Sequence, residues 1–182
     1  MKYKFQIHLD DNDYLEFNKF HMLRSPYGKK QIINLRVTMC VITLAMVLIS
    51  LVTGSFSIDS FISVIPLLLI ITVFQISLKK ITVSSLKSTI SRAKKKGKMP
   101  YPSSSVMEFF DEGFIETTKE QRTEQKYSAL ERVSVVEGKY VYLYVNNIMA
   151  YIIPNVSFDS REQYKEFLSF INEKCPNIDF YK

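Results

Sequence analysis

The chain has 182 residues, 47% of them hydrophobic, with five glycines, two cysteines and a net charge of +6, which excludes collagen, a disulfide-stapled scaffold and a disordered tail. A protein that is soluble throughout is also excluded, because 22 uncharged residues separate Arg36 from Asp59 and 19 more separate Asp59 from Lys79. Residues 79–102 carry a charge of +8 and residues 103–182 a charge of −4. A nucleic-acid binder usually carries its basic patch on the folded domain, so no nucleic-acid partner is expected.

The first 28 residues are expected to lie in the cytoplasm and to begin with a strand. In residues 2–9 apolar side chains alternate with polar ones, which is the period of a half-buried strand. Such a strand would leave its backbone groups unpaired if it stood alone. We therefore expect it to pair with the edge of a sheet that begins at Val106, which makes one split domain.

A short amphipathic helix should follow this strand and pack beside the sheet. Asp10 and Asp11 suit its start, and Asp13 with Glu16 has the spacing of a capping box. The turn-forming residues of Ser25–Gly28 should end it.

Two apolar segments predict a transmembrane helical hairpin over residues 32–79, with spans at about 35–54 and 60–79. A helix rises 1.5 Å per residue and the hydrocarbon core is about 30 Å thick, so about 20 residues suffice to cross it. The alternative is a pair of buried core helices, but soluble cores seldom contain two adjacent runs this apolar. The connection at residues 54–60 should be a tight turn.

The charges around the hairpin predict its orientation. Basic residues flank both spans on their outer sides, and the connection contains no Lys or Arg. Basic flanks stay in the cytoplasm, so we expect a multi-pass protein of the cell membrane with both termini cytoplasmic. The two uncharged runs, residues 37–58 and 60–78, contain no ionisable side chain except the thiol of Cys40, whereas ion pathways normally need carboxylates, His or Arg. The hairpin is therefore interpreted as an anchor.

Residues 80–102 should continue the second span as a basic helix and end in a linker. Their basic cluster is a candidate contact for anionic lipid headgroups, because Lys and Arg beside a span gain about 1 kcal/mol each near the membrane surface. The alternative is that the cluster only sets the orientation, and both roles can hold. The candidate residues are Arg92, Lys94, Lys95, Lys96 and Lys98.

Residues 103–182 should form a cytoplasmic domain in which an antiparallel meander of five or six strands is capped by a C-terminal helix. Turns are expected at Asp111–Gly113, where the glycine can take a positive φ, at Gly138, and at Asn146–Asn147, where asparagine tolerates the left-handed region. The helix should begin at Asp159 and Ser160 and stop before Pro176. Its apolar face is formed by Tyr164, Phe167, Leu168 and Ile171.

The expected class is thus membrane α+β, with a transmembrane hairpin and a sheet that closes as a PH-like, partly open barrel. One strand of that sheet carries a row of tyrosines, Tyr140, Tyr142 and Tyr144, which alternate with aliphatic residues. An exposed row of this kind is a candidate interaction surface. The alternative, which we favour, is that the N-terminal strand or helix packs on it.

The chain resembles the YcxB-like family of small bacterial membrane proteins over nearly its whole length. The resemblance rests on DYLEFNKFHMLRSP (Asp13–Pro26), on the hairpin that follows, and on YVYLYVNNIMAYIIPNVSF with EFLSFINEK (Tyr140–Lys174). It implies a cytoplasmic PH-like domain on a two-helix anchor. The family has no established activity and supplies no active-site residues.

Motifs that carry chemistry are sparse. His8 and His21 lie 13 residues apart without a metal-binding pattern, and neither a nucleophile elbow nor a phosphate-binding loop is present in the sequence. We therefore expect no catalytic residue, no metal, no cofactor and no enzyme activity. The expected function is that of a membrane-anchored adaptor or regulator, with membrane lipids and a protein as partners. The alternative is an accessory subunit whose hairpin packs against a transporter or channel.

Overall fold

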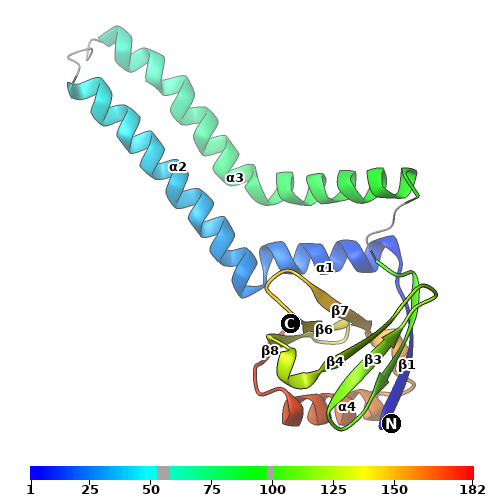
Figure 1. Ribbon diagram of the computed structural model, residues 1–182. Helices are drawn as coiled ribbons and strands as arrows, with labels where there is room; N and C mark the ends of the chain where they lie inside the picture. Colours follow the sequence, from blue (N-terminus) through cyan, green and yellow to red (C-terminus); the bar gives the residue numbers. More distant parts are fainter. Residues whose placement is uncertain (53–57, 98–100) are drawn as a thin grey trace. The chain divides into compact units, whose positions relative to one another are not determined.

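The computed structural model describes residues 1–52, 58–97 and 101–182 (Figure 1). The expected turn at residues 54–60 therefore lies largely outside the described residues. The chain divides into two compact units, one formed by Met1–Phe17 with Arg92–Lys182 and the other by Asn18–Ser91. The second unit is thus an insertion into the first.

The first sheet of the split unit joins segments from both sides of the insertion. It contains β1 (Tyr3–His8), β2 (Ser104–Phe109), β3 (Gly113–Thr117) and β4 (Arg122–Lys126), antiparallel and in that order. Phe5 of β1 is opposite Met107 of β2. The predicted pairing of the N-terminal strand with the edge of the sheet is confirmed.

The second sheet contains β5 (Arg132–Val136), β6 (Tyr140–Tyr144), β7 (Ala150–Pro154) and β8 (Ile178–Tyr181), in the order β7-β6-β5-β8. The strand β8 is parallel to β5 and was not predicted. The expected single meander is wrong, because the 3₁₀ turn η1 (Tyr127–Ala129) follows β4 and the chain then starts a separate sheet.

One hydrophobic core lies among the two sheets and helix α4 (Arg161–Lys174). Phe167 of α4 is fully buried and makes edge-to-face contacts with Phe5 of β1 and Phe109 of β2, with ring centroids 5.1 and 4.9 Å apart. These pairs add to the stabilisation that burial of the rings provides. The core therefore depends on a strand that precedes the insertion.

The start of α4 agrees with the prediction. The Ser160 side chain accepts a hydrogen bond from the Gln163 backbone N–H at 3.1 Å, and the Gln163 side chain accepts one from the Asp159 N–H at 2.8 Å. These bonds satisfy backbone donors that a helix leaves free at its first turn. The helix ends at Lys174, before Pro176, as expected.

The first two helices differ in detail from the prediction. Helix α1 (Asp11–Leu23) is capped by Asp10 and Asp13, whose carboxylates accept from each other's backbone N–H at 2.8 and 2.9 Å, and not by the expected pair of Asp13 and Glu16. Helix α2 (Pro26–Val52) begins inside the turn that was expected only to end α1. The Ser25 hydroxyl accepts from the Gly28 N–H at 3.1 Å, so Pro26 occupies a first-turn position, where its missing N–H has no cost.

Helices α2 and α3 (Ile58–Lys95) are long and apolar enough to cross a membrane. The candidate spans within the described residues are Pro26–Ile49 and Leu68–Lys95, and only 0% and 6% of their most apolar windows are buried. The side chains of the core helices in a soluble protein would be covered. The structure therefore disfavours the alternative of buried core helices.

Two predicted turns form by other means than a left-handed backbone. Gly113 has no positive φ; it lies at the start of β3, where a Cβ atom would collide with the backbone carbonyl of Gln125. The Asn146 side chain accepts from the N–H groups of Ile148 and Met149 at 2.9 and 2.8 Å, and no described residue other than glycine has a positive φ. Gly138 does adopt the left-handed region, with a φ of 68°.

Candidate functional site

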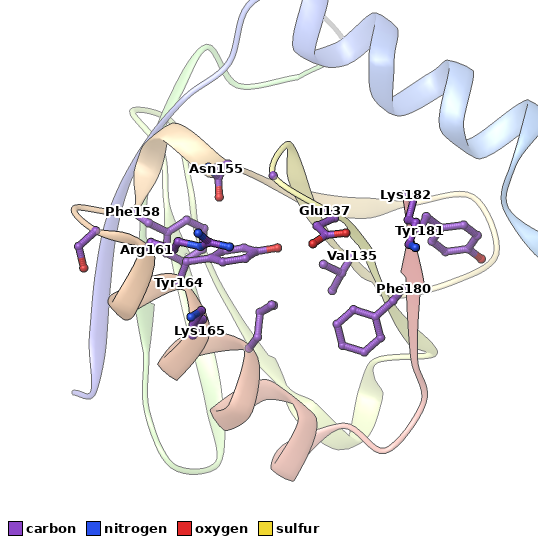
Figure 2. A pocket seen from close by; sticks show the side chains of 13 residues that line it. Val135, Glu137, Asn155, Phe158, Arg161, Tyr164, Lys165, Phe180, Tyr181 and Lys182 are labelled. Atoms are coloured by element: carbon purple, nitrogen blue, oxygen red, sulfur yellow. The ribbon is translucent and has the colours of Figure 1, made fainter.

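A cleft of about 770 Å³ separates α4 from β8 in the split unit (Figure 2). The chain leaves α4 at Lys174 and enters β8 at Ile178, so the two elements are joined at one end by three residues and enclose the cleft. Its volume lies in the range of small-molecule and peptide-anchor pockets. The cleft is the candidate functional site.

The walls of the cleft are apolar. Val135 of β5 is 1% exposed, and its strand neighbour Phe180 of β8 is 66% exposed, so the phenyl ring is largely uncovered. Leu168 and Tyr164 belong to the wall that α4 provides, and Phe158 completes the apolar lining. Figure 2 shows Tyr164 and Phe180 on opposite sides of the cavity. An exposed aromatic ring beside a cavity is a favourable contact for an apolar group of a ligand.

The rim of the cleft is mostly basic. Arg161 and Lys165 lie one turn apart on α4, Lys182 lies on the opposite side, and Glu137 is the acidic member of the lining. Burial raises the pKa of the Tyr164 hydroxyl, and the negative charge of Glu137 adds to this effect. Tyr164 therefore stays protonated at neutral pH. The cleft can hold an apolar group with an acidic neighbour at its rim.

The described residues contain no group of three or more His, Cys, Asp or Glu side chains that could hold a metal ion. His8 is exposed on β1, and His21 is buried and stacks on Tyr27 with ring centroids 5.6 Å apart. Neither belongs to the lining of the cleft.

The basic cluster predicted to contact lipid is divided by the structure. The Lys94 ammonium donates to Asp11 at 2.5 Å, and the Tyr101 hydroxyl donates to the same carboxylate at 2.7 Å. These two bonds lower the pKa of Asp11, with the bond from Lys94 as the larger cause. Lys94 is therefore engaged in holding the end of α3 to the start of α1. Lys95 and Lys96 are exposed, Arg92 takes part in another interaction, and Lys98 lies outside the described residues.

The tyrosine row on β6 is not an exposed surface. Tyr142 and Tyr144 are 1% and 0% exposed, and Phe17 of α1 lies against both, with ring centroids 5.3 and 6.0 Å away. The Tyr140 hydroxyl donates to Asp13 of α1 at 2.9 Å. Burial raises the pKa of Tyr144 to about 12. The prediction of an exposed tyrosine row is therefore wrong, and the alternative, in which the first helix packs on this face, is confirmed.

Arg132 was missed by the sequence reasoning. Its guanidinium is buried and lies 3.9 Å from the centroid of the Tyr144 ring, and one of its nitrogens lies 3.8 Å from a carboxylate oxygen of Glu131. The stacking replaces part of the hydration that burial removes from the cation. The sequence signal for this contact was the alternation along β5, which puts Arg132 on the same side of the sheet as the tyrosines of β6.

The fold defines a class of protein in which a two-sheet α+β domain is interrupted by a pair of long apolar helices. Residues 109–171, from the end of β2 into α4, match the family model described as YcxB-like protein, so this part of the chain is similar to that family. The match confirms the resemblance over about a third of the chain and does not include β1, the two apolar helices or β8. The comparisons with curated proteins and with solved structures gave no match.

Proposed function

We propose that this protein is a membrane-anchored adaptor or regulator. In this proposal α2 and α3 cross the cell membrane with both termini in the cytoplasm, and the YcxB-like domain, with a PH-like architecture, binds a protein partner through the cleft between α4 and β8. The lipids that surround the hairpin are its second class of partner.

The proposed anchoring is supported by the uncovered apolar surface of the two long helices. Large side chains such as Ile42 and Leu44 of α2 and Ile70 of α3 are 55–65% exposed. Soluble proteins rarely leave contiguous apolar surface of this extent open to water, whereas lipid covers it without cost. The flanking Lys and Arg residues support the cytoplasmic placement of the termini.

The single observation that carries the binding role is the uncovered Phe180 in a cleft with a basic rim. The rest of the domain core is closed, since the Phe, Val, Leu and Ile side chains that build it are almost all less than 9% exposed. A cavity with apolar walls and charged groups at its rim fits an apolar side chain of a partner that has an acidic neighbour.

Site-specific crosslinking in cells tests this role. A photoreactive phenylalanine analogue in place of Phe180 should crosslink a partner, whereas the same analogue at Val156, which is 90% exposed and outside the cleft, should not. The crosslink at position 180 should weaken when Arg161 and Lys165 are replaced by Gln. Equal crosslinking from both positions would contradict the proposal.

Exchange of the hairpin separates this proposal from the accessory-subunit alternative. If residues 32–79 are replaced by an unrelated two-helix anchor, an adaptor should keep the partner captured at position 180. A partner that is lost with the native hairpin, but kept when Phe180 is changed to Ser, would favour an accessory subunit that packs in the membrane.

A further inference from the structure

A second, shallow groove of about 470 Å³ lies within the inserted unit. One side is formed by Leu23, the last residue of α1, and the other by residues of α3, namely Lys79, Lys80, Val83, Ser84 and Lys87. The lining thus combines three lysines and a hydroxyl with two apolar side chains. Among the residues that the structure describes, no acidic one contributes to it.

Helical geometry explains why these side chains meet. Lys79, Val83 and Lys87 follow one another at intervals of four residues, and so do Lys80 and Ser84, which places all of them on one side of α3. With a rise of 1.5 Å per residue, Lys79 and Lys87 are about 12 Å apart along the axis. The ammonium groups can therefore reach an anion from both ends of the groove, while Leu23 and Val83 form its apolar part.

The three lysines differ from Lys94 in their surroundings. Lys94 is paired with Asp11, whereas none of the ion pairs found among the described residues includes Lys79, Lys80 or Lys87. All three are exposed. Three neighbouring cations without a carboxylate repel one another, so binding of an anion between them is favourable.

The position of the groove along α3 indicates the source of this anion. Leu78 is the last residue of the uncharged run, and Lys79 is the first charged residue after it. If the run crosses the membrane, Lys79 and Lys80 lie at the level of the lipid headgroups. Basic pockets beside spans on the cytoplasmic side are typical contacts of anionic headgroups.

We propose that this groove binds the headgroup of an anionic phospholipid. The ammonium groups of Lys79, Lys80 and Lys87 and the hydroxyl of Ser84 donate to its phosphate, and Leu23 and Val83 contact the apolar part of the lipid next to the headgroup. The site lies at least one helical turn before the cluster Arg92–Lys96. It rests on the proposed membrane insertion of α2 and α3.

Native mass spectrometry of the full chain in mixed micelles tests the site, with phosphatidylglycerol and phosphatidylcholine as competing probes. The wild type should retain phosphatidylglycerol in preference to phosphatidylcholine. The double change Lys79→Gln with Lys87→Gln should lower this retention by at least about tenfold. The matched change Lys95→Gln with Lys96→Gln, which removes the same charge from exposed positions of α3, should lower it less than about threefold.

Three results would overturn the site: no preference for phosphatidylglycerol in the wild type, equal losses in both double variants, or displacement of the lipid by millimolar inorganic phosphate. The variant with Arg at positions 79 and 87 should retain the lipid, which shows that charge and not altered folding is measured. Extraction of membranes with alkaline carbonate keeps the two proposals apart. Release of the wild type would refute the anchor itself, whereas a retained wild type without lipid preference refutes the groove alone.

Discussion

Truncation of Phe5 measures how far the split domain depends on a strand that precedes the apolar helices. Phe5 is 2% exposed, and its ring lies 5.7 Å from that of Phe109, 4.8 Å from that of Phe158 and 5.1 Å from that of Phe167. These three partners belong to the part of the chain after the insertion. Phe5→Ala should therefore destabilise residues that are about a hundred positions away in sequence.

The expected loss follows from the burial of the ring. Truncation of a fully buried phenylalanine costs about 3–5 kcal/mol, and a domain has about 5–15 kcal/mol of stability in total. For a domain of this size the melting temperature falls by roughly 4–8 °C per kcal/mol, so a decrease of more than about 10 °C is expected. Gln6→Ala is the matched control, because Gln6 is exposed on the same strand and should change stability by less than about 0.5 kcal/mol.

The assay is the protease resistance of residues 103–182 in membranes, followed with an epitope at the C-terminus. Phe5→Ala should make this segment much more sensitive than Gln6→Ala does, and deletion of residues 1–9 should do at least as much. If the two substitutions give the same protease resistance, β1 does not complete this core, and the split domain is refuted.

Three other predictions concern single contacts and the topology. Ser160→Ala removes the cap of α4 and should cost about 1 kcal/mol in the free energy of unfolding, measured by denaturant titration against the neutral control Ser169→Ala. The pKa of Asp11 is lowered in the folded protein, so the stabilisation that Asp11 provides is present above the ordinary carboxyl pKa and is lost as the pH falls through the lowered value. The difference in melting temperature between the wild type and Asp11→Asn should therefore disappear in acid. A difference that stays constant with pH would contradict this prediction. In a background without native cysteines, Ser57→Cys, in the sequence between the two spans, should react with an impermeant thiol reagent on intact cells and Ser104→Cys only after permeabilisation. The reverse pattern would refute the orientation.

The elements that could be predicted are those specified by local patterns. The alternation in residues 2–9 indicated β1, and the serine at position 160 with the apolar face of α4 indicated that helix and its start. The pairing of β1 with β2 was predictable as well, because an edge strand with an apolar face needs a partner. In each case the information lies within a few residues or in a requirement that every strand shares.

The features that could not be predicted depend on contacts between distant segments. The strand β8 has four residues and is parallel to β5, so no hairpin signal announces it, yet it forms one wall of the cleft. The engagement of Lys94 by Asp11 joins residues 83 positions apart. The sequence suggested that Gly113 serves a left-handed turn. Its actual role is to allow the close approach of the Gln125 backbone, which excludes a Cβ atom and can be seen only in the folded chain. The candidate site itself was missed for the same reason.

Because the domain is formed by two separate segments of the chain, only some fragments of this protein can be studied alone. A fragment limited to residues 109–171 would lack β1, most of β2 and all of β8, and would leave the core aromatic Phe167 without Phe5. A longer fragment, residues 103–182, would still leave β2 as an unpaired edge strand, because the backbone groups on that side of β2 bond to β1 in the whole chain. A fragment that matches the compact unit, residues 1–17 joined by a linker to residues 92–182, keeps these pairings and also the bond between Asp11 and Lys94. Loss of binding by a shorter fragment would report an incomplete core and not the absence of a partner site.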